Sequence, residues 1–302
     1  MKKLLLYIGT LLLFSGTVQA QYMSGSVFLN GRYLETVVAP NGSMISSSPP
    51  PPGYHVGAGT AGRTYGLVAD PDKDGWLIGF PPFTGDYTAF GYPIEDWILF
   101  ADGNTARPDV GKWDTGITSG MKGVNTRYIA TAKETGSEWQ GKWNDLELRQ
   151  LTTVSLDGLH IRVNIEFNNK GTTTIRDIYY ARSCDPDIDG EFCKAVPPGS
   201  CLGLSTHNKI VNQSPDPKSR VWAYAQGDSL DYIMGITTND CRAKAFFLEW
   251  NLRVTVRLDS LYNELVPYAR YSVGYNFYTD AAMGLVFKLD SLKAGESTSI
   301  SF

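Results

Sequence analysis

The stretch LHIRVNIEF, from Leu159 to Phe167, decides the fold class because apolar and polar side chains alternate along its whole length. A period of two residues places one set of side chains on a buried face of a β-strand and the other set on a wet face. Asp157-Gly158 separates this run from the preceding LRQLTTVSL. Asp-Gly between two such runs is typical of a tight hairpin turn, so the stretch predicts an antiparallel hairpin.

The rest of the chain repeats this pattern in short pieces separated by turn residues. LRVTVRL (252–258) alternates in the same way, and a short helix over 278–283 is the one helical alternative. Further strands are predicted over residues 24–31, 33–39, 63–69, 96–102, 126–132, 220–226, 231–237, 244–250, 284–289 and 296–302. Many short strands of this kind predict an all-β chain, folded as a large antiparallel β-sandwich or super-sandwich with few or no helices.

The composition excludes some functions. The 302 residues include 16 Pro, 31 Gly and 12% aromatic side chains, which is typical of a globular β-rich chain and not of a disordered one. The net charge is −4 and basic residues form no cluster. A nucleic-acid partner requires a basic face, so we expect none.

The first residues, MKKLLLYIGTLLLFSGTVQA, have the layout of a cleaved secretory signal peptide. Two lysines precede an apolar run from Leu4 to Phe14, and small residues stand at −3 and −1 before Gln21. The run is too short to span a bilayer comfortably. We expect residues 1–20 to be removed and 21–302 to form one β-sandwich domain without a membrane span, either secreted or at the cell surface.

The chain contains four cysteines, and in an exported protein an even number favours disulfides. Three pairings of Cys184, Cys193, Cys201 and Cys241 are possible. In one of them, Cys193–Cys201 closes a short loop and Cys184–Cys241 ties an acidic loop to a distant strand. A zinc site is the weaker alternative, because the spacings contain no CxxC.

Two loops share the pattern Asp-Pro-Asp-x-Asp-Gly, and both predict either a calcium site or a stiff turn. The carboxylates at positions 1, 3 and 5, followed by Gly, match the front half of a calcium loop. Asp and Pro are also favoured turn residues, so the pattern fits a turn without metal equally well. The candidate calcium ligands are Asp70, Asp72 and Asp74 in the first loop and Asp185, Asp187 and Asp189 in the second.

Neither acidic loop is an EF-hand. The bidentate Glu expected at position 12 is replaced by Pro81 in the first loop and by Val196 in the second. A calcium site would therefore recruit a distant carboxylate, for which Asp86, Asp96 and Asp240 are candidates.

No nucleophile, metalloprotease or nucleotide-binding motif is present in the sequence. A glycosidase would need two carboxylates at a set separation, which the sequence does not fix. The available acids are Glu95, Asp96, Glu138, Glu166 and Asp240. The sequence therefore assigns no catalytic residue.

Three residues are candidates for ligand binding. Trp139 and Trp143, in EWQGKW, could stack on a sugar ring, and the alternative is that they pack in the core. His207, in STHNK, is expected in a loop after the cysteine cluster.

Three segments, FNNKGTTTIRDIYYARSCDPDIDG, DCRAKAFF and DAAMGLVFKLDSLKAGESTSISF, resemble a module of large exported surface proteins from bacteria that use type IX secretion. The resemblance spans most of 67–302. It implies a β-sandwich of the large two-sheet kind also found in sugar-processing proteins and a surface role such as adhesion, and it supplies no catalytic residue. The chain ends at Phe302, inside a predicted strand, whereas larger relatives continue to a sorting domain. We therefore expect a fragment or a short paralogue.

Three functions remain open. The first is a non-enzymatic module for adhesion or carbohydrate binding, whose partner is a surface glycan or an extracellular protein. The second is a carbohydrate-active enzyme of the mutarotase or glycosidase kind, with paired carboxylates. The third is a structural domain of a larger surface protein. A flat aromatic face without paired carboxylates would favour the first, and an aromatic-lined cleft holding two close carboxylates would favour the second.

Overall fold

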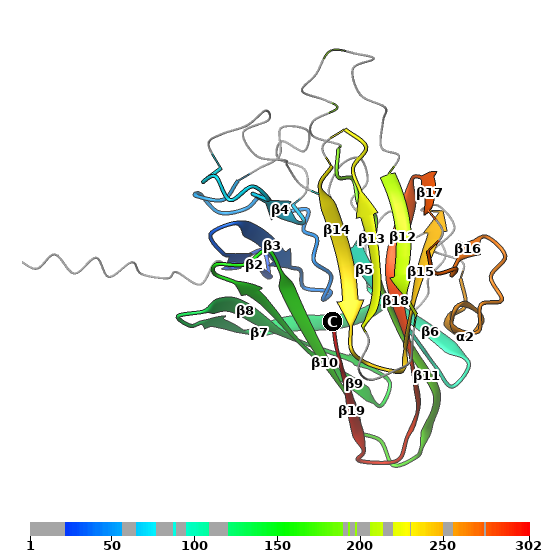
Figure 1. Cartoon of the computed structure of the whole chain (residues 1–302). Coiled ribbons are helices and arrows are strands. Elements are labelled where there is room, and N and C mark those ends of the chain that lie inside the picture. The colour runs from blue at the N-terminus through cyan, green and yellow to red at the C-terminus, as the bar shows by residue number, and fades with distance from the viewer. Residues whose placement is uncertain are drawn as a thin grey trace, which may run out of the picture.

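The computed structural model describes residues 22–55, 65–76, 87–88, 95–108, 120–189, 193, 197, 206–213, 220–229, 231–249, 256–274 and 276–302. Nearly all of the regular structure in these segments is β-strand, and the helix among them is the five-residue α2, Leu258–Tyr262 (Figure 1). The predicted all-β class is confirmed. The first 20 residues lie outside the described segments, so the signal peptide stays a prediction.

The largest sheet has 11 strands in the order β16-β15-β18-β11-β5-β6-β7-β8-β9-β10-β19. All neighbours in it are antiparallel except β6 and β7, which pair in parallel. The strands are β5 (Glu95–Ala101), β6 (Asn104–Pro108), β7 (Gly120–Ala130), β8 (Glu134–Trp143), β9 (Leu146–Ser155), β10 (Ile161–Asn169), β11 (Ile175–Cys184), β15 (Ala243–Glu249), β16 (Ala269–Arg270), β18 (Ala281–Leu292) and β19 (Ser297–Ser301).

Two four-stranded sheets complete the molecule (Figure 1). The N-terminal sheet has the order β1-β2-β3-β4 and contacts β7, β8 and β9. Its strands are β1 (Tyr22–Met23), β2 (Ser26–Asn30), β3 (Leu34–Val38) and β4 (Val68–Ala69). The second sheet has the order β14-β13-β12-β17 and contacts β15 and β18. Its strands are β12 (Thr206–Asn212), β13 (Val221–Gln226), β14 (Ile233–Thr238) and β17 (Asn276–Thr279).

The hairpin predicted from LHIRVNIEF is present as β9 and β10. The strands pair in a continuous antiparallel register from Ile161↔Val154 to Asn169↔Leu146. Val163, Ile165 and Phe167 are buried in the main core cluster. The period-two pattern therefore marks the true inner face of this strand.

The central strands are buried on both faces. From β5, Trp97 and Leu99 join the main core cluster, whereas Ile98 and Phe100 join a second cluster on the opposite face. The second cluster includes α2, whose Leu258 packs there. The helix thus covers the outer face of these strands, while their inner face packs against β8–β10 and the β12–β14 sheet.

Two local expectations are wrong. Residues 278–283 are not helical but form the end of β17 and the start of β18. The run LRVTVRL falls largely outside the described segments, and its last residue, Leu258, begins α2 instead of ending a strand.

Within the described residues, no helix has the length and apolar character needed to cross a membrane.

Candidate functional site

The outer face of the β14-β13-β12-β17 sheet carries a row of aromatic side chains. The registers Tyr224↔Lys209 and Gln226↔His207 between β13 and β12 place these four side chains on one side of the sheet. His207↔Tyr278 extends the same side to β17, since directly paired residues share a face. Residues of the other parity, such as Ala223 and Ile210, are buried in the main core.

The aromatic rings on this outer face are open to solvent. Trp222 is 42% exposed and Tyr278 is 57% exposed. The rings of Trp222 and Tyr224 lie 6.0 Å apart between centroids and are tilted by 46°. Opposite Tyr224, β14 has Gly235, where an added Cβ would stand 3.1 Å from Trp222 Nε1. The missing side chain leaves room for the indole, which keeps this part of the face flat.

Polar groups surround the rings. His207 Nε2 lies 3.6 Å from Asp228 Oδ1, and the Tyr278 hydroxyl donates to the same oxygen at 3.3 Å. At the β13–β14 turn, Gln226 Nε2 donates to Asp231 Oδ1 at 3.3 Å. Tyr278 is thus held next to His207 and Asp228, whose remaining polar atoms can bind a ligand's hydroxyl groups.

The inner side of the same sheet holds the face rigid. Asn208, which is fully buried, donates from Nδ2 to the carbonyl of Thr279 at 2.8 Å and so links β12 to β17. Phe277 packs edge-on against Phe247 of β15, with ring centroids 5.2 Å apart. A platform anchored in this way loses little entropy when a ligand binds.

Sequence reasoning identified His207 and missed its neighbours. His207 lies on β12 and not in a loop, as had been expected, because its strand pairs on both sides. Trp222 and Tyr224 were overlooked, although the pattern VWAYAQ over 221–226 contained the signal. Small apolar residues on one parity and aromatic residues on the other predict a strand whose large rings point outward.

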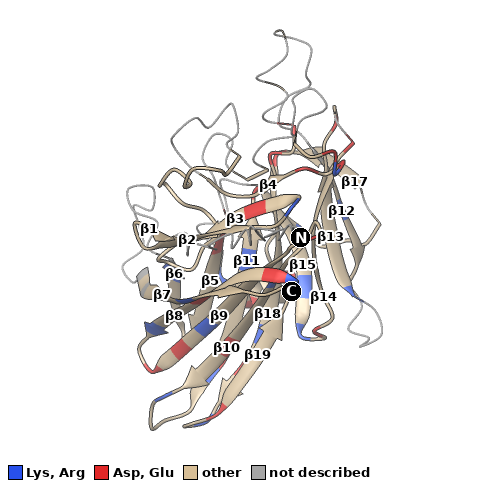
Figure 2. Cartoon of the chain, turned by 90° about the vertical axis from the view of Figure 1, so that its left-hand side faces the viewer, with Lys and Arg blue, Asp and Glu red and all other residues tan. Residues whose placement is uncertain are grey.

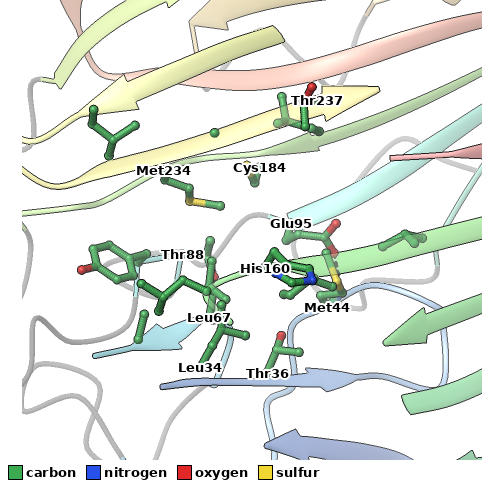
Figure 3. Close-up of a pocket in the computed structure, with 18 of the residues that line it drawn as sticks. Leu34, Thr36, Met44, Leu67, Thr88, Glu95, His160, Cys184, Met234 and Thr237 are labelled. Atoms are coloured by element: carbon green, nitrogen blue, oxygen red, sulfur yellow. Dashed lines mark hydrogen bonds between the residues drawn. The ribbon is translucent and has the colours of Figure 1, made fainter. Parts of the chain in front are cut away.

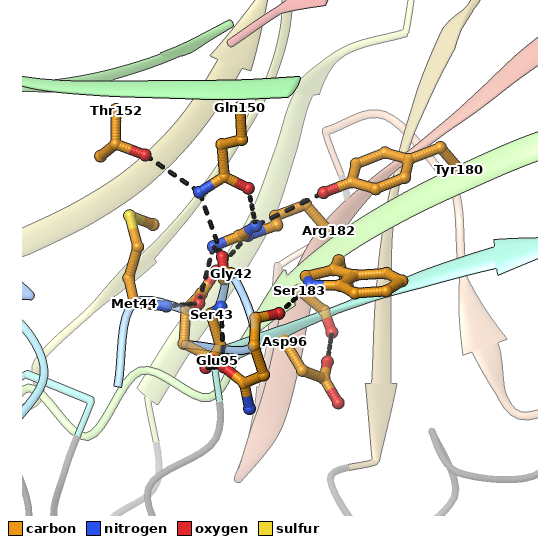
Figure 4. Close-up of polar contacts among 12 residues, drawn as sticks. Gly42, Ser43, Met44, Glu95, Asp96, Gln150, Thr152, Tyr180, Arg182 and Ser183 are labelled. Carbon is orange, nitrogen blue, oxygen red and sulfur yellow. Dashed lines mark hydrogen bonds and ion pairs between the residues drawn. The ribbon is translucent and has the colours of Figure 1, made fainter. Parts of the chain in front are cut away.

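One carboxylate considered for catalysis, Glu95, is bound inside the sandwich to Arg182 (Figure 4). Arg182 Nη2 donates to Glu95 Oε2 at 2.9 Å, and Arg182 Nε donates to Oε1. The backbone N–H of Met44 also donates to Glu95. Burial raises the pKa of Glu95, although the neighbouring Arg182 acts to lower it. The hydrogen bonds between the two side chains occupy both of them.

Other candidate acids are held by neighbouring side chains. Glu138 accepts from Arg149 at 2.7 Å and from Arg127 at 3.2 Å. Asp240 pairs with Arg242 at 2.6 Å, and Asp96 accepts from the Ser183 hydroxyl at 3.0 Å. Each of these contacts uses the carboxylate structurally, and the five acids lie on separate elements apart from adjacent Glu95 and Asp96.

The two acidic loops meet at one end of the molecule, where red segments gather in Figure 2. Ala69, the last residue of β4 before the first loop, and Ile188 of the second loop pack in the same small core cluster. The Tyr232 hydroxyl donates to Asp72 of the first loop, and the Ser229 backbone N–H donates to Asp189 of the second at 2.7 Å. Both loops are therefore anchored on the turn between β13 and β14.

Within the first loop, Asp70 behaves as a turn residue. Its carboxylate accepts from the backbone N–H groups of Asp74, Gly75 and Trp76 at 3.0–3.3 Å. This is the local side-chain-to-backbone bonding that stiffens an Asp turn.

In the second loop, Asp185, Asp187 and Asp189 are all buried. Burial raises the pKa of Asp280, which lies between β17 and β18. Over the described residues, no group of three or more His, Cys, Asp or Glu side chains is arranged to hold a metal ion. Calcium therefore stays a prediction.

The cysteines do not follow the full predicted pairing. Cys193 is disulfide-bonded, Cys201 lies outside the described residues, and Cys184 and Cys241 carry free thiols. The suggested Cys184–Cys241 bond is wrong for a geometric reason. Cys184 aligns with Met283 of β18, whereas Cys241 precedes the pair Ala243↔Phe287, so the two lie at least about 13 Å apart along the strand. A disulfide requires Cα atoms within about 7 Å.

Trp139 and Trp143 lie far from the outer face. Trp139 is 1% exposed, and its indole donates to the carbonyl of Pro40 at 2.7 Å. This placement corrects the platform hypothesis for Trp139, because a core ring offers no face to a ligand. Trp143 is partly buried against the same core.

Comparison with known proteins identifies no family for this chain. No protein-family model matches it, and no curated protein matches it. Among solved structures it is similar to a putative kojibiose phosphorylase from human microbiome, with 7% sequence identity and a TM-score of 0.36. The match covers 93% of this chain and 32% of that one, so the chain spans about a third of that protein. A similarity this low supports no statement about activity or substrate, and the resemblance to type IX surface modules also stays a prediction.

Proposed function

We propose that the chain is a non-enzymatic carbohydrate-binding module that takes a neutral oligosaccharide on the outer face of the β14-β13-β12-β17 sheet. The observation that carries the proposal is the row of exposed rings on a flat strand face. The two faces of a pyranose ring are rich in C–H groups and its rim carries hydroxyls. Aromatic rings flanked by side-chain donors and acceptors complement both features.

The extent of the face favours an oligosaccharide over a single sugar. Trp222 and Tyr278 are four residues apart along the strands and two strands apart across the sheet, which is a separation of about 16 Å. The described charged side chains on the face are few and of both signs, with Lys209 against Asp228. A neutral ligand therefore suits the face better than an anionic one.

The position of the carboxylates favours binding over hydrolysis. Among the described residues, the rings on this face are not flanked by two acids free to share a glycosidic bond, since Asp228 is engaged with His207 and Tyr278. Export, either by secretion or to the cell surface as the N-terminal residues predict, would place such a module where glycans are met.

A glycan array probed with the labelled chain tests the proposal, with and without EDTA. We expect binding to neutral oligosaccharides that Trp222→Ala weakens about tenfold, because one stacking contact accounts for about 1.4 kcal/mol. Tyr22→Ala is the matched control, since Tyr22 is equally exposed but lies on the N-terminal sheet. Equal losses for both variants, or no binding to any glycan, would contradict the proposal, and the latter would favour a structural domain.

A further inference from the structure

A cavity of about 270 Å³ lies behind the sheet that carries the aromatic face (Figure 3). It is bounded by β3 and β4 of the N-terminal sheet, by β14, by the start of β10 and by the end of β11. The cavity is separate from the rings of Trp222 and Tyr278, neither of which lines it. The proposed carbohydrate site does not use this cavity.

The walls of the cavity are mainly apolar. Aliphatic and thioether side chains from four elements or their flanking segments face it, among them Leu34, Met44, Leu67, Ile161 and Met234. Figure 3 shows Met44 and Met234 approaching from different elements. Methionine adapts its shape to a bound molecule, so walls of this kind tolerate ligands of varied outline.

Exposed apolar side chains mark the mouth of the cavity. Leu159, in the turn before β10, is 37% exposed, and Ile233, at the start of β14, is 58% exposed. Both line the cavity, together with the exposed His160. Large apolar residues in water beside an apolar hollow are typical of a ligand entrance.

One polar group in the wall lacks a partner among the residues that the structure describes. Thr36 of β3 is fully buried, and its hydroxyl makes no hydrogen bond with the described residues. Figure 3 shows this hydroxyl oxygen directed toward the neighbouring lining side chains. Leaving a buried hydroxyl unpaired costs about 1–3 kcal/mol, a cost that a ligand with a hydrogen-bonding end would remove.

The cationic group in the wall is not available to a ligand. Among the described residues that line the cavity, Arg182 alone is a lysine or arginine. All five of its N–H groups make hydrogen bonds. They donate to Glu95 twice, and to Gln150, Tyr180 and Gly42 once each. A carboxylate ligand would therefore find no free N–H donor on Arg182, and its own charge would be buried against apolar walls at a high cost.

We propose that this cavity is a binding site for a neutral, largely apolar small molecule with one hydrogen-bonding end placed at Thr36. Its size sets the class of ligand. An apolar cavity of about 150 Å³ holds a single benzene ring. A space somewhat less than twice that volume fits a bicyclic aromatic compound or a medium-chain alcohol.

The probe that tests the site is N-phenyl-1-naphthylamine, which is neutral and becomes fluorescent in apolar surroundings. We expect one saturable site per chain. Decanol should displace the probe at a concentration at least about tenfold lower than decanoate, because only the alcohol enters the apolar cavity without carrying a charge into it. Displacement by both competitors at the same concentration would overturn the proposed ligand class.

Two substitutions locate the probe. Ala69→Leu adds a side chain at a lining position and should weaken probe binding at least about tenfold, whereas the exposed Ala130→Leu should leave it unchanged. Thr36→Val keeps the shape of the wall and should raise the concentration of decanol needed for displacement several-fold. Unaltered binding in both cavity variants would place the probe elsewhere and overturn the proposal.

A second measurement keeps the test decisive if Ala69→Leu fails to fold. Met44 and Met234 line the cavity, whereas Met121 is buried in the main core and does not line it. In a sample with ¹³C-labelled methionine methyl groups, bound decanol should shift the signals of Met44 and Met234 and leave that of Met121 in place. Unmoved signals of Met44 and Met234, or no saturable binding of either compound, would overturn the proposal.

Discussion

Arg182 is stable inside the sandwich because its neighbours satisfy every N–H group it has (Figure 4). Gln150 completes the arrangement, since it accepts from Arg182 at 3.0 Å and donates to Thr152 at 3.0 Å and to the Gly42 carbonyl at 3.1 Å. Burial lowers the pKa of Arg182, but the charge of Glu95 more than offsets this and raises it. The hydrogen bonds of Arg182 cross-link β5, β11 and the loop after β3.

Removing Arg182 should destabilise the fold strongly. Arg182→Met leaves Glu95 buried without its cation, which costs about 3–5 kcal/mol in the free energy of unfolding. Urea denaturation measures this directly. The control Arg32→Met removes an exposed ion pair with Asp157 and should leave the unfolding midpoint unchanged. A small loss for Arg182→Met would show that water reaches the pair.

Glu138 should make stability depend on pH in the acid range. The hydrogen bond from Arg149 holds the pKa of Glu138 below its ordinary value. A carboxyl with a lowered pKa in the folded state stabilises the protein above its unfolded pKa near 4.5 and loses that contribution as pH falls through the folded pKa. Glu138→Gln should therefore cost about 1 kcal/mol at pH 7 and nothing well below pH 4. Equal costs at both pH values would show that the charge is not responsible.

Single residues were the hardest feature to predict from sequence. Glu95 was considered only as a candidate acid and Arg182 was not singled out, because nothing in their local pattern indicates that the two are partners in the interior. Trp139 was taken as a possible surface ring for the same reason. Burial of these side chains depends on strands that are distant in sequence, so only the assembled sheets reveal it.

At the scale of elements, β7 and β8 are fitted to one another around the Trp139 ring. Gly123 and Gly141 pair directly across the two strands. An added Cβ at Gly141 would stand 2.2 Å from the Trp139 ring, and one at Gly123 would stand 2.3 Å from it. The glycine in EWQGKW is thus required by the ring two residues before it.

Adding a methyl group between these strands should displace the ring. Gly141→Ala should lower the free energy of unfolding by about 1–3 kcal/mol, because a well-packed core does not absorb an extra carbon. In a Trp139→Phe background the smaller ring leaves space, so the same substitution should cost less. Urea denaturation of the four proteins gives the coupling, and equal costs in the two backgrounds would contradict this packing.

The elements divide into those that sequence predicts and those that it does not. The β9–β10 hairpin was predictable because one face of β10 is partly exposed to water and the alternation survives. In β5 both faces are buried, so the apolar pattern is continuous and carries no face information. β12 looked like a loop because His207 and Lys209 face outward and the inward position between them is held by a polar residue, Asn208.

At the scale of the whole molecule, the two acidic loops and the aromatic face share one element. The β13–β14 turn receives a carboxylate from each loop, and β13 carries Trp222 and Tyr224. Sequence predicted both loops but not their meeting, because the contact is made through Tyr232 and Ser229, which no motif identifies. A change that stiffens either loop should therefore also stiffen the sheet that bears the aromatic face.

Calcium should raise the melting temperature of the chain if the predicted loops bind it, since an ion that binds only the folded state stabilises it. Thermal unfolding in calcium at about 1 mM, compared with unfolding in excess EDTA, measures the shift in melting temperature. Asp187→Asn should abolish the shift and serves as the control. An unchanged transition in EDTA would favour the alternative in which both loops are turns without metal.

The central claim, that the exposed rings of the β14-β13-β12-β17 sheet bind an oligosaccharide, is tested most directly by the indole N–H signals of a ¹⁵N-labelled sample. The chain has seven tryptophans, of which Trp222 is exposed on this face, while Trp97 and Trp139 are buried in the core. On addition of an oligosaccharide selected from the array, the account predicts that the Trp222 signal shifts and that those of Trp97 and Trp139 stay in place. Binding that leaves the Trp222 signal unmoved would contradict it.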